Sequence, residues 1–221
     1  MDFKGVAKGL ILHIICDSIL IQELAIPGSD TRCGVNLICR PSLDVKALIE
    51  GFQARLRGAE PGQYYYPPSD LHLTVFEITH SIDAQQAAEI GEFVASHHEE
   101  WSTALPRFEL ESPAIAFDER GCALRFRTDE RIVAARRHIS EELSGLGVRL
   151  MPRHAQGSAH ITFMRYTRSL MTDPKSWFHI LSNMSAPHAL TWTVTELGLT
   201  WGATWFGMRS RVVERGPYHL Y

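Results

Sequence analysis

This 221-residue chain lacks several features that would assign it to a common class of protein. Its four cysteines include no Cys-x-x-Cys pair and show no spacing typical of metal ligands, which argues against a disulfide framework or a cysteine-based zinc site. No glycine-rich loop precedes a Lys-Ser or Lys-Thr pair, so nucleotide triphosphate chemistry has no support. We therefore expect reduced, mostly buried thiols and a cytoplasmic location.

The chain also lacks an excess of either charge. Its 22 Lys and Arg residues stand against 25 Asp and Glu residues, which gives a formal net charge of −3. A protein that coats nucleic acid broadly would be strongly basic. A small anionic substrate, or only the end of an RNA, fits this composition better.

Long hydrophobic runs are missing as well. The most apolar stretch near the N-terminus, residues 10–26, contains Asp17 and Glu23, whereas a spanning helix needs about 20 predominantly apolar residues. No small-residue cleavage site follows it, so we expect neither a transmembrane segment nor a signal peptide. The sequence predicts an N-terminal extension over residues 1–31, whose role it does not define, followed by a single two-lobed domain over residues 32–221.

A short His-x-Thr motif occurs twice. The first copy pairs His72 with Thr74, and the second copy, 88 positions later, pairs His160 with Thr162. Residues i and i+2 of a strand point to the same face, so each copy directs an imidazole and a hydroxyl the same way. Two such strands facing each other would form a pocket with two histidines and two threonines.

The predicted secondary structure repeats with the motif. Each half of the chain follows the order β-α-β-α-β, with the motif in the middle strand. Outside the motifs, the predicted strands cover residues 33–39, 107–117, 122–127, 192–201 and 209–219, and the predicted helices are capped by Ser42, Asp83, Thr128 and Asp173. The helix after Asp83 is expected to continue to Trp101. A duplication of this length predicts an α+β fold of two pseudo-symmetric lobes, each an antiparallel sheet with helices on its outer face.

The chain has 11 histidines, so some matches to the motif arise by chance. His138-Ile139-Ser140 is such a match. It lies in a predicted helix, where residues two apart diverge by about 200° around the axis and cannot share a target. The two strand motifs differ because they occupy matching places in a repeat.

The motif strands, Tyr-Pro-Pro-Ser-Asp-Leu-His-Leu-Thr-Val-Phe and His-Ile-Thr-Phe-Met-Arg, resemble the signature strands of the 2H phosphoesterase superfamily. The branch they resemble most is that of the RNA 2′,3′-cyclic phosphodiesterases, also called 2′-5′ RNA ligase-like proteins. The resemblance implies that His72 and His160 are catalytic and that Thr74 and Thr162 bind the phosphate. The family usually has proline before the second histidine, where this chain has Ala159.

The chemistry implied is hydrolysis of a 2′,3′-cyclic phosphate on a nucleotide or RNA end, leaving a 2′-phosphate, without a metal or another cofactor. One imidazole activates water and the other protonates the departing oxygen, which gives a bell-shaped dependence of rate on pH. The resemblance suggests His160 as the base and His72 as the acid. Two alternatives remain open: cleavage or ligation of 2′-5′-linked oligonucleotides, and a non-catalytic nucleotide-binding module.

A few other residues are candidates for the site. Arg165 matches a substrate-contacting arginine of the bacterial branch, with an ordinary surface ion pair as the alternative. Strand alternation places it opposite His160, so it would reach the pocket only through a bulge or from a neighbouring rim. Tyr66 is expected to pack in a cluster with its neighbours, with stacking on a base as the alternative. Five arginines resemble a basic patch, but interleaved acidic residues favour a solvated helix face: Arg125, Arg127, Arg131, Arg136 and Arg137. The tryptophans at 192, 201 and 205 are expected in the core. We expect a monomer with no metal site.

Overall fold

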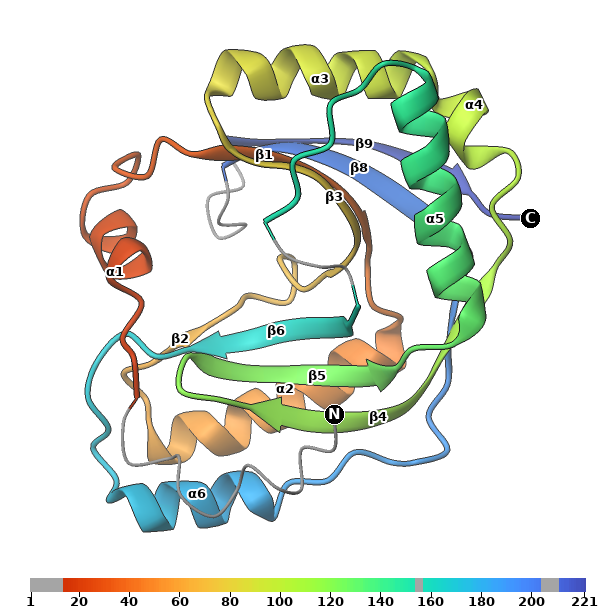
Figure 1. Ribbon diagram of the computed structural model, residues 1–221. Helices are drawn as coiled ribbons and strands as arrows, with labels where there is room; N and C mark the ends of the chain where they lie inside the picture. Colours follow the sequence, from red (N-terminus) through yellow and green to blue (C-terminus); the bar gives the residue numbers. More distant parts are fainter. Residues whose placement is uncertain (1–13, 154–156, 204–210) are drawn as a thin grey trace.

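The computed structural model describes residues 14–153, 157–203 and 211–221. It contains two antiparallel sheets that face each other (Figure 1). The first sheet has the order β3 (Leu73–Ile82), β1 (Cys33–Cys39), β8 (Glu196–Ala203), β9 (Val212–His219). The second sheet has the order β2 (Tyr64–Tyr65), β6 (Ala159–Arg165), β5 (Gly121–Arg127), β4 (Phe108–Phe117), β7 (Trp192–Val194).

Helices cover the outer faces of both sheets (Figure 1). The first sheet carries α3 (Ala84–Ser96) and α4 (His98–Ser102), while α5 (Glu130–Gly145) contacts β3 of the first sheet and β4 of the second. The second sheet carries α2 (Leu43–Ala59), and α6 (Pro174–Ser182) lies beside α2 below it. The predicted α+β fold of two pseudo-symmetric lobes is therefore confirmed.

The lobes do not coincide with the two halves of the sequence. The trio β3-β1-β8 of the first sheet corresponds to the trio β6-β5-β4 of the second, so β4 and β8 are exchanged between the halves. The helices cross over too, since α2 follows β1 but packs against β6, while α5 follows β5 but packs against β3. Each lobe thus depends on residues from both halves, which the linear order of predicted elements does not reveal.

Most helix starts follow the predicted caps. The side chains of Ser42, Asp83 and Asp173 each accept a backbone N–H from the first turn. The prediction of Thr128 as a cap is wrong, because Asp129 accepts the N–H groups of two residues in α5. The helix predicted to continue from Asp83 to Trp101 is two helices, α3 and α4, joined at His97.

The core is built from both sheets and their helices. Trp192 and Trp201 are buried in it, as predicted, while residue 205 lies outside the described residues. The strand predicted over residues 192–201 is interrupted at Thr195 and forms β7 and β8. The four cysteines are free thiols, and three of them are buried: Cys33, Cys39 and Cys122.

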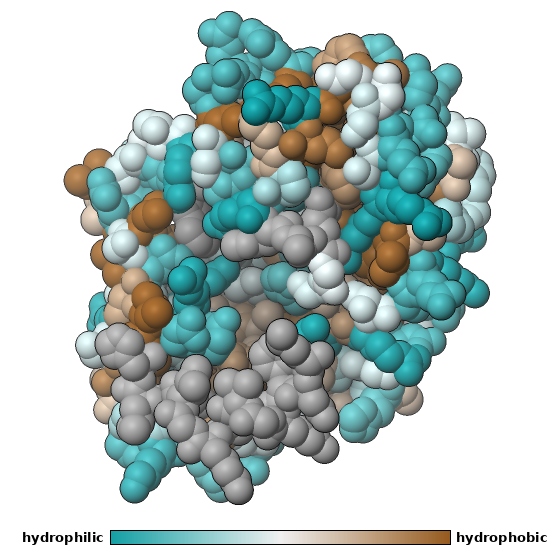
Figure 2. All heavy atoms as spheres, in the orientation of Figure 1, coloured by the Kyte–Doolittle hydropathy of each residue, from teal (hydrophilic) through white to brown (hydrophobic). Residues whose placement is uncertain are grey.

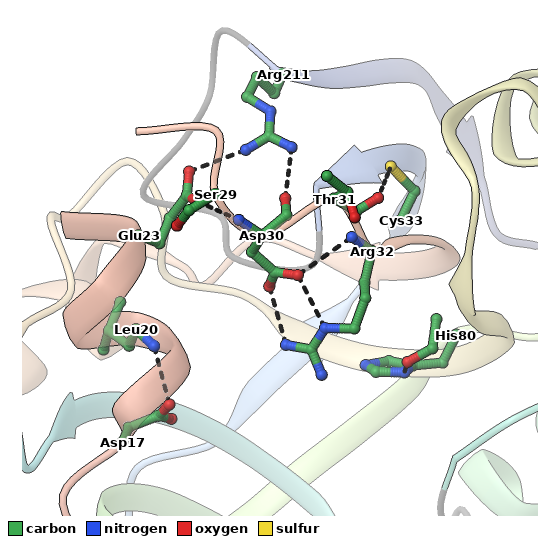
Figure 3. Close-up of polar contacts among 11 residues, drawn as sticks. Asp17, Leu20, Glu23, Ser29, Asp30, Thr31, Arg32, Cys33, His80 and Arg211 are labelled. Carbon is green, nitrogen blue, oxygen red and sulfur yellow. Dashed lines mark hydrogen bonds and ion pairs between the residues drawn. The ribbon is translucent and has the colours of Figure 1, made fainter. Parts of the chain in front are cut away.

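The described part of the N-terminal extension ties the two lobes together. Before α1 (Ser18–Ala25), the N–H groups of Ile15 and Asp17 donate to the carbonyls of Glu119 and Tyr166 in the second lobe. Within α1, buried Glu23 pairs with Arg211 beside the first lobe (Figure 3).

The outer side of α1 is apolar, and hydrophobic side chains gather where Figure 1 places this helix (Figure 2). Its exposed residues include Ile19, Ile21 and Leu24. In the part of the chain that the structure describes, no helix is both long and apolar enough to cross a membrane.

Candidate active site

The two His-x-Thr motifs lie on β3 and β6, which belong to different sheets and contact each other between them. His72 directly precedes β3 and Thr74 lies within it, while His160 and Thr162 lie in β6. All four side chains keep some exposure, whereas the alternate residues are buried: Leu71, Leu73, Ala159 and Ile161. Each motif thus turns its imidazole and hydroxyl away from the core on the same side of its strand.

The ring of His72 is held by its own segment. Its Nδ1 lies 2.7 Å from the carbonyl oxygen of Asp70, so Nδ1 carries a proton and donates it there. The pKa of His72 is lowered to about 4, chiefly by burial and also by the charges of Arg40 and His160, while the hydrogen bond to Asp70 opposes the shift. His72 is therefore neutral at pH 7, with Nε2 as its unprotonated nitrogen. The influence of His160 also shows that the two imidazoles lie within electrostatic range of each other.

His160 is held in a matching way by a side chain. Its Nδ1 lies 3.0 Å from the hydroxyl oxygen of Ser158, two residues earlier. Much of its ring surface is exposed, yet desolvation by the surrounding protein lowers its pKa, and the charges of Arg165, Arg125 and Arg136 add to this effect.

A β-bulge follows each threonine. In β3, Thr74 and Phe76 pair with successive residues of β1, which leaves Val75 without a ladder partner. In β6, Thr162 and Met164 pair with successive residues of β5, which leaves Phe163 extra. An extra residue reverses the alternation of the strand beyond it.

The bulge in β6 brings Arg165 to the side of His160 and Thr162. Phe163 and Met164 are both buried, whereas Arg165 is partly exposed and its charge acts on His160. The hydroxyl of Tyr66 hydrogen-bonds the Arg165 side chain. Tyr66 itself is buried and meets Tyr64 edge-on at 5.1 Å, so it packs in the expected aromatic cluster and holds Arg165.

The same reversal in β3 affects Glu77, which occupies the place equivalent to Arg165, five residues after the histidine. Its carboxylate accepts the N–H of Arg153 at 2.7 Å. Arg153 belongs to the loop that leads to Ser158 and His160. The two equivalent positions therefore carry opposite charges, so the site is symmetric in its imidazoles but not in its surroundings.

Among residues 14–153, 157–203 and 211–221, no three or more His, Cys, Asp or Glu side chains are grouped so that they could hold a metal ion. The described histidines of the motifs thus do not form part of a protein-built metal centre of that size.

No protein-family model matches the sequence, and no curated protein matches it. Solved structures do match. TT0787 of Thermus thermophilus aligns with a TM-score of 0.55 and 16% identity over 82% of this chain and 93% of that one. E. coli LigT in its apo form aligns with a TM-score of 0.53 and 12% identity over 84% of this chain and 95% of that one. A structure described as a phosphoesterase gives a TM-score of 0.52 and 14% identity over 85% and 98%. The chain has the 2H phosphoesterase fold.

Three residues of this 2H phosphoesterase fold that contact the motifs or the segments next to them were not identified as site residues from the sequence. Arg40, directly after β1, donates to the carbonyls of Ser69 and Leu71 and pairs with Glu214 at 2.7 Å beside His72. Ser158 precedes His160 by two residues, a spacing that places both on one face of a strand, and this spacing was a usable signal. The prediction that Arg136 belongs to a solvated helix face is wrong, because this residue is buried and only 6% exposed.

Proposed function

We propose that this protein is a phosphodiesterase that opens 2′,3′-cyclic phosphates of nucleotides or RNA ends and leaves 2′-phosphates. The observation that carries the proposal is the pair of imidazoles, His72 and His160, presented from facing strands within electrostatic range of each other. In-line opening of a cyclic phosphate needs a base at the attacking water and an acid at the departing ribose oxygen. Two imidazoles on opposite sides of one phosphorus atom supply both.

The threonine hydroxyls complete the site. Thr74 and Thr162 lie two residues beyond the histidines on the same sides of their strands and are partly exposed. Their hydroxyls donate to the non-bridging oxygens of the phosphate, where negative charge increases in the transition state. Arg165, held by Tyr66, adds a positive charge on the His160 side, which favours an anionic substrate.

The pKa of His72 bears on which imidazole has which role. The resemblance assigns water activation to His160 and protonation of the leaving oxygen to His72. A pKa of about 4 keeps His72 unprotonated at pH 7, which alone would suit a base. We retain the assignment of His72 as the acid because a bound phosphate places negative charge beside both rings and raises their pKa values.

An aryl phosphodiester distinguishes the two roles. Its leaving group needs no protonation, so replacing the acid costs little while replacing the base remains costly. We expect His72→Ala to retain most of its activity on a 4-nitrophenyl phosphodiester and His160→Ala to lose it. The opposite pattern would reverse the two roles and leave the proposed reaction in place.

Support for a nucleotide as substrate comes from chemistry and from one neighbour. E. coli LigT has been solved in complex with 3′-AMP, with a TM-score of 0.52 and 12% identity to this chain. The arginine charges around His160 fit a phosphate group on such a small ligand. The chain's overall charge of −3 does not favour extended RNA, so we propose a mononucleotide or an RNA end.

The test is a product assay with excess chelator present. We expect 2′,3′-cyclic mononucleotides to be converted to 2′-monophosphates, with no 3′-monophosphate. Turnover of 2′-5′-linked dinucleotides instead would favour the alternative chemistry of the same four residues. Binding of a mononucleotide with no turnover of either substrate would refute the proposal in favour of a binding module.

A further inference from the structure

Two buried side chains connect the motifs to each other. Arg136 lies on α5 and Gln53 lies on α2, the two equivalent helices of the repeat. They are 6% and 3% exposed, although arginine and glutamine are usually found at the surface. A polar side chain is retained in the core only where its hydrogen bonds are satisfied, so their partners indicate what they do.

Both side chains bind the carbonyl of a bulge. The Nε of Arg136 donates to the carbonyl of Val75 at 2.8 Å, directly after Thr74. The Nε2 of Gln53 donates to the carbonyl of Phe163 at 2.9 Å, directly after Thr162. Val75 and Phe163 are the extra residues of the two bulges and have no partner in β1 and β5, respectively. The carbonyl of Phe163 also accepts the N–H of Tyr66 at 3.1 Å, so Gln53 reinforces a backbone contact there.

Each side chain also reaches the segment that enters the other motif. The Nη2 of Arg136 donates to the carbonyl of Ser158 at 2.7 Å, and the hydroxyl of Ser158 holds His160. The Nε2 of Gln53 also donates to the carbonyl of Tyr66 at 2.8 Å, in the segment that leads to His72. Both partners of the glutamine amide are carbonyls, which only its nitrogen end can satisfy.

We propose that Arg136 and Gln53 are positioning residues that fix the separation of His72 and His160, because each joins the bulge of one motif to the segment entering the other. The two connections are crossed and related by the pseudo-symmetry of the fold. Both side chains donate to backbone carbonyls, and we assign neither of them a contact with the substrate. The assignment of an effect on turnover rests on the proposed function, whereas the effect on the imidazoles does not.

Arg136 is charged and Gln53 is neutral, so replacing them should affect the pKa of His160 differently. Arg136 is one of the charges that lower the pKa of His160, after desolvation and together with Arg165 and Arg125. Among the described residues, the charge of Asp118 opposes these arginines, and the His72 imidazole also lies within electrostatic range of this ring. Gln53 is neutral and can act only through geometry.

The experiment compares three variants with matched controls. Arg136→Gln and Arg136→Lys alter the first connection, and Gln53→Met alters the second with a side chain of similar length. The controls are Arg137→Gln, exposed one residue further along α5, and Gln86→Met, exposed on α3. Imidazole resonances of His72 and His160 are titrated by NMR, the affinity for inorganic phosphate is measured, and kcat/KM is measured on a 2′,3′-cyclic mononucleotide. Circular dichroism confirms which variants are folded.

We expect Arg136→Gln to raise the pKa of His160 towards its ordinary value, while Arg136→Lys keeps it lowered. Lysine is a compact donor that cannot reproduce the fork of two guanidinium nitrogens on two carbonyls. Arg136→Lys and Gln53→Met should therefore both lower kcat/KM by about 10- to 100-fold in folded protein, as misplacement of reacting groups by about 1 Å does. Both control variants should match the wild type.

Folded Arg136→Lys and Gln53→Met variants with wild-type kcat/KM would overturn the proposal and leave both residues with a purely structural role. If the wild type turns over no cyclic nucleotide, the proposed function fails by itself. The affinity for inorganic phosphate then decides the positioning role: an unchanged affinity in Arg136→Lys and Gln53→Met refutes it, and a weakened affinity in both supports it.

Discussion

Glu23 offers a sharp test of how the N-terminal segment is held. Its carboxylate has 1% of its side chain exposed and accepts four hydrogen bonds (Figure 3). One oxygen accepts the N–H of Gly28 at 2.7 Å and the Nη1 of Arg211 at 2.9 Å. The other accepts the N–H of Asp30 at 2.7 Å and the hydroxyl of Ser29 at 3.2 Å. Every partner is a donor, so the site requires a group that only accepts.

The substitution Glu23→Gln keeps the shape of the side chain but replaces one acceptor oxygen by an NH₂ group. Whichever way the amide is turned, its NH₂ faces two donors and two hydrogen bonds are lost. Bonds to charged groups contribute about 1.5–3 kcal/mol each, so we expect a loss of about 3 kcal/mol at pH 7. This agrees with the lower end of the range for a broken buried ion pair, about 3–5 kcal/mol. For a chain of this size the melting temperature falls by roughly 6–12 °C.

The pH dependence of this loss has a defined sign. Burial would raise the pKa of Glu23, but the N–H groups of Asp30 and Gly28, the Ser29 hydroxyl and the charge of Arg211 outweigh it and hold the pKa below its ordinary value. The stabilisation is therefore present above the unfolded-state pKa of about 4.3 and is lost as the pH falls through the folded-state pKa. The gap between wild type and Glu23→Gln should close below about pH 4.

Thermal and urea unfolding at several pH values measure the gap, with Glu50→Gln on the exposed face of α2 as the control. Amide exchange at Ile21 and Ile26, whose N–H groups bond within the segment, reports detachment of the segment alone. An unchanged melting temperature and unchanged exchange in Glu23→Gln at pH 7 would refute the reasoning. A gap that widens on acidification would do the same.

Three further outcomes are expected. Thr74→Val and Thr162→Val should each lower kcat on a 2′,3′-cyclic nucleotide by about 10²–10³-fold, because each removes one hydrogen-bond donor to the charge of the transition state. Steady-state kinetics measure this loss, and a loss under about threefold would contradict a phosphate-binding role. Sulfate binding at about pH 5.5 should take up protons, measured by calorimetry in buffers of different ionisation enthalpy, because an anion raises the low pKa of His72; the uptake should shrink in His72→Ala. Gly91→Ala should destabilise the fold by about 1–3 kcal/mol in urea unfolding, because the added methyl would overlap the buried indole of Trp201. Gly51→Ala lies in α2 with open space around it and should stabilise the fold by up to about 1 kcal/mol.

Much of the fold follows from local signals that the sequence displays openly. Ser42, Asp83 and Asp173 are polar residues placed directly before apolar stripes, and each caps the helix predicted for it. The two motifs lie on equivalent strands, as their spacing of 88 residues indicates. These features depend on neighbours in the sequence, so sequence reasoning reaches them.

The features that were missed depend on contacts between distant segments. The exchange of β4 and β8 between lobes is a choice of partner strand, which hydrophobic alternation does not encode. Arg136 lies among other arginines on a charged helix, and only its contacts with Val75 and Ser158 show why it is buried. The bulge that turns Arg165 towards His160 likewise arises from pairing with β5, although the need for it could be inferred from strand alternation.

The central claim is that His72 and His160 act together on one phosphorus atom. Its most direct test is kcat/KM on a 2′,3′-cyclic mononucleotide for His72→Ala, His160→Ala and the double variant, each verified as folded. We expect each single change to lower the rate by about 10²–10⁴-fold, and the double change to cost far less than the product of the two. Either single variant retaining the wild-type rate, or losses that multiply in full, would contradict the account.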